Sequence, residues 1–546
     1  MDDFRQRYAE LLTGSYDCVD RIVLNAYFPM GHNPGGFRVW WRRWHDDGDD
    51  SLDDAHLMRL AGRFARRVRG WATANGVPVI NCAAGDRKHR IAEDYLRDHT
   101  VGIGVFLILV AKAPATVWKV TRSKKSGAIQ NLEKTRQFVN HYSFHIMDPT
   151  WGHLTIKMSG HPPFAAQVIL NGHEYVACTA HAAEVGFCKE GNCFTGIGDP
   201  ERLAQIADTL SQSGTAGRLG QVIDAWIHTA CLCFGLDLAD QQRSYFHYAY
   251  SVYQVEYSRN LIFDSPRTME RLFETVVDRI RARLDVPAVR TLFGVGQRPR
   301  RPDPELSPRQ GVVIQRPRWN LTIFKIHFGL LTLKAYTKGE RVLRFEAIVH
   351  NTTALHTGRA LDKFGAIVTR LTGMVDRFTT MLDCVDIAFL PDGILDQLPE
   401  PSQIGAVRVG GLDTNKPRTR AAMTAVTTLA IAPDGFTVAD FAAQVCAHTG
   451  TDYTIRQAAY DLRKLRGKQL VVKPGRGHRY HVPADAARTV TGLIRLRDHV
   501  IDPVLAGARK PLGRPPHTYT RIDRDYDTLR TGIRTLFTDL GIHTAA

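Results

Sequence analysis

The chain has 546 residues, of which 44% are hydrophobic and 23% are charged, as in globular proteins. This length exceeds what one ordinary hydrophobic core supports, so the sequence predicts several domains and excludes wholesale disorder. A formal net charge of +16 favours polyanionic partners such as nucleic acids.

The distribution of charge and cysteine adds detail. Residues 1–100 carry 15 Lys/Arg against 15 Asp/Glu, whereas residues 419–546 carry 19 against 11. Nine cysteines are scattered, and the charged start "MDDFRQRYAE" is unlike a signal peptide, so we expect a cytoplasmic protein. The most apolar run, 101–111, is far shorter than the roughly 20 residues that span a bilayer, so we expect a buried strand and no membrane partner.

The predicted elements begin with short strands and a helix near 53–75, whose apolar residues recur at intervals of three and four. From residue 101, strand-like runs separated by turns predict an antiparallel sheet. Helices are expected to dominate 199–293. Asp199-Pro200 and Ser265-Pro266 each place an N-cap acceptor before a proline, which marks two helix starts.

A Pro/Gly/Arg-rich stretch at 294–311 predicts a linker, and 390–405 begins another loop-rich boundary. The expected fold class is α+β, with a mixed N-terminal body of antiparallel sheets and a helical middle, then a C-terminal winged helix-turn-helix domain. We divide the chain into 1–100, an α/β segment; 101–293, strand-rich and then helical; 312–390, a second strand and helix region; 419–483, the winged helix; and 484–546, C-terminal helices.

The segment 436–483 has the order helix, helix, helix, wing. In its third helix the apolar residues Ile455, Ala458 or Ala459, Leu462 and Leu465 share one face, with Thr454 as N-cap and Gly467 as stop. The expected nucleic-acid contacts are Arg456, Gln457, Tyr460, Arg463 and Lys464 on the opposite face, with Arg476, His478 and Arg479 in the wing. The alternative is a winged helix that mediates protein contacts and has a solvated basic face.

The hairpin "LTLKAYTKGERVLRFEAIVHN" at 331–351 is the sharpest catalytic candidate. Alternation places Lys334, Tyr336 and Lys338 on one face and brings Arg344 and Glu346 to a common side. The strand pair resembles one found in some phage and plasmid replication initiators. The candidate catalytic set is Tyr336, Lys338, Arg344, Glu346 and Glu256; the alternative is a charged outer face of an ordinary hairpin.

Metal ligands are less well marked. Initiators with a tyrosine nucleophile usually carry a His-hydrophobic-His triplet, which this chain lacks; His141 and His145 are the nearest substitute. One short segment is rich in possible zinc ligands: His173, Cys178, His181, Cys188 and Cys193. The spacing of Cys188 and Cys193 is similar to that in zinc sites, but the segment has no second ligand pair with matching spacing. If the chain is catalytic, Mg²⁺ or Mn²⁺ is the expected cofactor, with carboxylates available at Asp148, Glu256, Asp264 and Glu346. The tyrosine-rich stretch 245–266 fits either base stacking or a core edge.

The chain from about 150 to 480 resembles a multi-copy bacterial family that behaves like a mobile element and carries a C-terminal winged helix. The matching stretches are "FHIMDPTWGHLTIKM", "LNGHEYVA", "GNCFTGI", "LKAYTKGERVLRFEAIVHN" and the winged helix. The resemblance implies a mobile-element role and carries over no catalytic residue.

The leading hypothesis is therefore a DNA-binding protein of a mobile genetic element that processes DNA strands, as a transposase or a replication initiator does. A winged-helix transcriptional regulator without catalysis and an RNA-binding protein are the alternatives. The oligomeric state stays open.

Overall fold

The computed structural model describes residues 3–274, 290–293, 311–318, 321–328, 330–386, 390–391, 393–432, 435–475, 477–501, 520–521, 524–525, 527–529, 531–532 and 535. The chain divides into two compact units. The larger unit comprises Ala9–Phe273 and Arg290–Val375, and the smaller comprises Met1–Tyr8, Glu274–Val289 and Asp376–Ala546.

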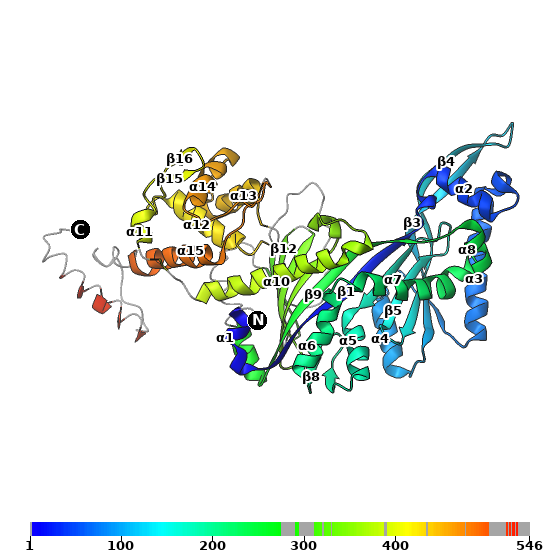
Figure 1. Ribbon diagram of the computed structural model, residues 1–546, viewed down its shortest axis with the longest axis horizontal. Helices are drawn as coiled ribbons and strands as arrows, with labels where there is room; N and C mark the ends of the chain where they lie inside the picture. The colour runs from blue at the N-terminus through cyan, green and yellow to red at the C-terminus, as the bar shows by residue number, and fades with distance from the viewer. Residues whose placement is uncertain are drawn as a thin grey trace. The chain divides into compact units, whose positions relative to one another are not determined.

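A 12-stranded sheet forms the larger unit, in the order β10-β11-β12-β13-β14-β9-β1-β6-β5-β4-β3-β2 (Figure 1). The strands are β1 (Leu12–Tyr27), β2 (Val79–Asn81), β3 (Gly104–Arg122), β4 (Ile129–Asp148), β5 (Gly152–Ser159), β6 (Ala166–Asn171), β9 (Ala249–Phe263), β10 (Arg290–Phe293), β11 (Gly311–Arg318), β12 (Leu321–Phe328), β13 (Leu331–Lys338) and β14 (Val342–Val349). Two pairs, β2–β3 and β10–β11, are parallel, and the other neighbours are antiparallel. Strands from the segments 1–100, 101–293 and 312–390, which the sequence suggested as separate regions, thus pair in one sheet.

Only part of the helices of this unit lie where the sequence places them, because those at 34–44, 88–98 and 172–182 were not predicted. They are α2 (Pro34–Trp44), α3 (Asp54–Ala74), α4 (Lys88–Asp98), α5 (Gly172–Ala182), α6 (Pro200–Asp208), α7 (Thr215–Trp226), α8 (Leu238–Ser244) and the first part of α10 (Phe364–Asp386). The Asp199 carboxylate accepts from Arg202 N, which confirms the predicted cap, and the helix after Ser265 begins at Pro266. The expectation that helices dominate 199–293 is wrong in one place, because most of the tyrosine-rich stretch is strand β9.

The two faces of the sheet differ in character. One register row is made of apolar side chains that are fully buried: Phe144, Ile156, Val168, Leu24 and Val252. The adjacent row, on the opposite face, is polar: Ser143, Lys157, Gln167 and Asn25. Side chains alternate along a strand, so this second face, which we call the polar face, continues across the sheet.

The smaller unit contains a short hairpin and several helices. Its elements are α11 (Ile394–Gln397), β15 (Ser402–Ile404), β16 (Val407–Val409), α12 (Pro417–Leu429), α13 (Val438–Thr449), α14 (Ile455–Gly467) and α15 (Ala484–Leu496). The predicted loop-rich boundary therefore holds a helix and a hairpin. In place of the two strands predicted after residue 470 there are isolated bridges, Val472 with His481 and Phe436 with Tyr480.

Helix α14 begins at the predicted N-cap. Thr454 Oγ1 accepts from Gln457 N, and the Gln457 side chain accepts from Thr454 N, which is a capping box. Leu462 and Leu465 are buried as expected, but Ile455 is 55% exposed and lies outside the packed face. This prediction was wrong because Ile455 occupies the first turn, before the helix enters the core.

Within the described part of the chain, no single helix has the length and apolar character needed to cross a membrane. One sharply bent pair of segments, Thr215–Phe234 and Leu238–Ser244, meets those requirements only when the two are taken together.

Candidate functional site

Two register rows on the polar face gather the catalytic candidates. The first row contains Tyr16, Asn260, Arg344 and Tyr336. The second contains Cys18, Ser258, Glu346 and Lys334. The hairpin is not an outer edge, because β14 lies between β13 and β9. The alternative of a charged outer face is wrong for Arg344 and Glu346, whose side chains are buried.

Arg344 is the centre of a buried ionic network. Its side chain is fully buried and contacts the Asp20 carboxylate, and its guanidinium lies 3.7 Å from Glu346 Oε1. It also donates to the Asn192 carbonyl over 2.7 Å. Such a guanidinium stays charged in any protein environment, so the two carboxylates are its natural partners.

Both carboxylates have a further partner. Lys334 Nζ lies 2.5 Å from Glu346 Oε2, and His173 Nδ1 lies 2.5 Å from Asp20 Oδ1. Burial opposes ionisation of Glu346, but Lys334 and Arg344 outweigh it and lower the pKa of Glu346. Burial and the nearby charge of Lys338 lower the pKa of His173 to about 3, so its imidazole is neutral at pH 7.

A bulge in β1 positions Asp20. The register with β9 shifts between Val19 and Ile22, so consecutive side chains no longer alternate strictly there. Asp20 thereby reaches Arg344, while its neighbour Arg21 lines a cavity on the same face.

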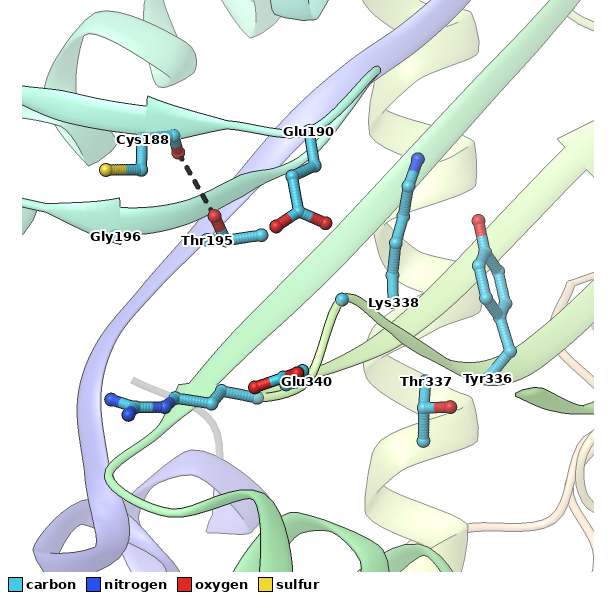
Figure 2. A pocket seen from close by; sticks show the side chains of 10 residues that line it. Cys188, Glu190, Thr195, Gly196, Tyr336, Thr337, Lys338 and Glu340 are labelled. Atoms are coloured by element: carbon cyan, nitrogen blue, oxygen red, sulfur yellow. Dashed lines mark hydrogen bonds between the residues drawn. The ribbon is translucent and has the colours of Figure 1, made fainter. Parts of the chain in front are cut away.

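Tyr336 and Lys338 line a first cavity of about 720 Å³ beneath the β7–β8 hairpin (Phe187–Lys189 and Phe194–Ile197). Figure 2 shows both side chains leaving β13 in the same direction, with Thr337 pointing away. Burial, with the charges of Glu346 and Glu256, raises the pKa of Tyr336 well above its usual value. Burial lowers the pKa of Lys338.

Glu256 lines a second cavity of about 930 Å³, which is separate from the first. Its wall includes Arg21, Lys157 and the N-terminal end of α4. Burial and the Glu346 carboxylate raise the pKa of Glu256. The structure thus brings Arg344 and Glu346 together, but it divides the rest of the predicted catalytic set between two cavities.

The histidines pair differently from the prediction. His141 contacts a backbone carbonyl of its own strand, at Val139, and not His145. His145 Nδ1 instead lies 3.0 Å from His153 Nε2 on the neighbouring strand, inside the second cavity. Burial lowers the pKa of His145 to about 3 and that of His153 to about 4, so both rings are neutral at pH 7.

The histidines and cysteines of 173–193, whose spacing is only partly zinc-like, do not form a metal site together among the described residues. Among the described residues, the donor atoms that come within 4.8 Å of one another in a group of three are those of Cys18, Asp20 and His173. The Arg344 guanidinium contacts the Asp20 carboxylate, and burial raises the pKa of the Cys18 thiol, which keeps it protonated. These residues suit an ionic network better than a metal ion, which requires deprotonated ligands.

Two of the carboxylates proposed from sequence lie elsewhere. Asp148 accepts from Thr150 N, Trp151 N and Trp226 Nε1, so it holds a turn and a helix in place. Asp264 is exposed at the end of β9. Neither belongs to the polar network.

In the smaller unit, Arg456, Tyr460 and Arg463 are exposed on α14, as predicted for a contact surface. Gln457 is engaged in the capping box, and Lys464 Nζ lies 5.0 Å from the centre of the Tyr460 ring. In the predicted wing, His478 is exposed, Arg479 donates to the Gly435 carbonyl, and Arg476 lies outside the described residues.

Sequence reasoning missed Asp20 and Tyr16 and assigned His173 to another site. Tyr16 donates to Cys193 Sγ and accepts from Phe194 N, which ties β1 to the β7–β8 hairpin. A signal was present, because Asp17 and Asp20 lie among the apolar residues Cys18, Val19 and Ile22 of a strand. Buried acids in a strand require partners, and Arg259 for Asp17 and Arg344 for Asp20 supply them.

Comparison of the chain with family models, with curated proteins and with solved structures finds no match.

Proposed function

We propose that this chain is a DNA-binding protein of a mobile genetic element, which binds duplex DNA through α14 and acts on a DNA strand at the polar face of the larger unit. The exposed face of α14 carries the proposal. Arg456 and Arg463 lie on it without any ion pair to a described residue, beside the phenol of Tyr460. Arginine can donate two hydrogen bonds to guanine or contact phosphate, and the major groove admits a helix.

The order of elements around α14 supports a winged-helix interpretation. Helices α12, α13 and α14 follow one another, and the chain after α14 returns to bridge Val472 with His481 and Phe436 with Tyr480. In a winged helix the third helix enters the groove and the returning segments contact the backbone. The bridges are the part of this arrangement that would form the wing.

The polar face supports action on a strand. Lys338 and Tyr336 offer a cation and a hydroxyl donor at the first cavity, where a phosphate oxygen would be stabilised. Glu346 is held ionised, and its charge reaches Glu256. Because Lys334 and Arg344 already neutralise Glu346, Mg²⁺ or Mn²⁺ in a metal-dependent cleavage would act at Glu256, which lines the second cavity.

The test for DNA binding compares the parent with a variant carrying Arg456→Ala and Arg463→Ala. We expect the variant to bind duplex DNA at least about tenfold more weakly, since each lost base contact costs about 1–3 kcal/mol. A control of equal charge change in the same unit, Arg408→Ala with Lys416→Ala, should bind like the parent. Equal binding by both variants, measured by fluorescence anisotropy, would contradict the proposal.

The test for strand processing incubates the protein with single-stranded DNA, duplex DNA and RNA, with and without Mg²⁺ or Mn²⁺. Glu346→Gln should abolish cleavage and leave duplex binding intact, whereas Glu184→Gln, on the exposed turn after α5 and outside both cavities, should retain both. A parent that binds duplex DNA without cleaving it would instead be a regulator. Preferential binding of RNA would identify an RNA-binding protein.

A further inference from the structure

Strands β3 and β4 continue beyond the sheet as a two-stranded arm, which we define as residues 111–140 (Figure 1). β2 pairs with β3 only at 108–110, and β5 pairs with β4 only from His141 onward. Within the arm the two strands therefore pair only with each other. The pairing runs from Lys112 and Asn140 to Arg122 and Ile129, with one register shift between Thr121 and Arg122.

The arm is strongly basic. It contains seven Lys/Arg and a single acidic residue, Glu133, so that 30 residues hold a net charge of +6 out of +16 for the whole chain. Six of these cations are exposed: Lys112, Lys119, Lys124, Lys125, Lys134 and Arg136. None of the six forms an ion pair with a described residue. Lys134 lies over the Trp118 ring, and the charge of the other five is available to a partner.

The arm is also anchored. Trp118 is buried, donates to the Gly31 carbonyl over 3.1 Å and packs on Phe37 of α2. Val120 N donates to Asp54 at the start of α3, and Arg122 donates to the Leu52 carbonyl. These contacts hold the outer half of the arm against the body of the unit. Lys124 and Lys125, in the turn of the arm, are therefore held in a fixed position.

An exposed aromatic residue accompanies the cations. Phe138 is 75% exposed, the highest value among the large hydrophobic side chains of the described residues. It pairs in register with Pro114 and lies on the same face as Arg136 and Lys112. Lysines alone on unpaired strands would serve to prevent edge-to-edge aggregation. An exposed phenylalanine works against that purpose and points to a binding surface instead.

We infer that the β3–β4 arm is a second DNA-contacting surface, whose cations bind the phosphates of a duplex while Phe138 inserts against the bases. Charge complementarity selects a polyanion, and a two-stranded ribbon fits the major groove, about 12 Å wide. In that groove a phenylalanine can make apolar contact with the methyl group of thymine. The inference rests on the proposed function in that its ligand is duplex DNA, but it uses residues remote in sequence from α14.

The test measures the salt dependence of duplex binding for three variants. An arm-charge variant, Lys124→Gln with Lys125→Gln and Arg136→Gln, should lower the slope of log affinity against log salt by about two to three units, because each phosphate contact contributes about 0.9. Phe138→Ala should weaken binding with little change in slope, because it removes no charge. The matched control is Arg59→Gln with Arg66→Gln and Arg69→Gln, on the exposed side of α3, which should leave the slope unchanged.

The outcomes separate this inference from the proposed function. Failure of the parent to bind any duplex would overturn both. If the α14 variant lost binding while the arm-charge variant kept the salt slope of the parent, only the inference about the arm would be overturned. An equal slope change in the α3 control would also overturn it, because it would show a diffuse charge effect. A loss seen with single-stranded DNA or RNA and not with duplex would assign the arm to a different ligand and refute the inference.

Discussion

Replacing Arg344 with methionine tests the buried ionic network most directly. The substitution keeps most of the side-chain volume but removes the cation between Asp20 and Glu346, whose side chains are only 1% and 3% exposed. Glu346 keeps Lys334, whereas the one ion-pair partner that Asp20 keeps among the described residues is His173, which is neutral at pH 7. Breaking a buried pair by removing one partner costs about 3–5 kcal/mol, so we expect Arg344→Met to lower the free energy of unfolding by that amount.

The assay is denaturant unfolding followed by tryptophan fluorescence. All eight tryptophans of the chain lie between residues 40 and 319, inside the ranges of the larger unit, so the signal reports that unit. The double variant Asp20→Asn, Arg344→Met removes both charges of the pair and should be more stable than Arg344→Met alone. A cost below about 1 kcal/mol for the single variant, or strictly additive costs in the double variant, would refute the reasoning.

Three further predictions concern pH and domain structure. Burial lowers the pKa of five histidines from the ordinary 6.5 to about 3 or 4: His45, His141, His145, His153 and His173. Between those pH values the unfolded chain binds more protons than the folded chain, so the free energy of unfolding should fall as pH drops from 6.5 toward 4. Acid unfolding that begins only below pH 3 would contradict this. The pKa of Asp49 is lowered to about 2, chiefly by its hydrogen bond from Arg42. The contribution of Asp49 to stability should therefore be complete above pH 4 and lost toward pH 2. Over that range, the free energy of unfolding of Asp49→Asn should depend less on pH than that of the parent. A fragment of residues 376–501 should melt cooperatively by circular dichroism. A fragment of 413–501, which keeps the whole of α12, should melt at lower temperature because it lacks the β15–β16 hairpin; equal melting temperatures would dismiss a role for the segment that was removed.

Local signals accounted for most of what the sequence predicted well. The Asp199 and Thr454 caps, helix α3 and the hairpin β13–β14 all depend on hydrogen bonds or packing between residues close in the chain. Strand β9 could have been recognised too, since its aromatic and valine-rich sequence favours a strand. Ile455 was misplaced because helical periodicity gives the face of a side chain but not whether the first turn is covered.

The network itself depends on contacts that no local pattern records. Asp20 and His173 are separated by more than 150 positions, and Arg344 lies a further 171 residues along the chain. The bulge in β1 decides that Asp20 shares a face with Arg344, and a bulge depends on the partner strand. For the same reason, the pairing of His145 with His153 was missed and the pair His141 and His145 was chosen instead.

The environment of Tyr336 bears on which chemistry the polar face can perform. A tyrosine nucleophile must lose its proton, and burial together with the charges of Glu346 and Glu256 makes that loss harder. As a neutral phenol it is better suited to donate a hydrogen bond to a phosphate oxygen, beside the amine of Lys338. Tyr336→Phe should therefore slow strand cleavage and leave a measurable residual rate, without any covalent protein–DNA adduct in the parent. Trapping such an adduct at Tyr336 in the parent, together with complete loss of cleavage in Tyr336→Phe, would show that DNA binding or a metal ion overcomes the local electrostatics and restores the nucleophile role.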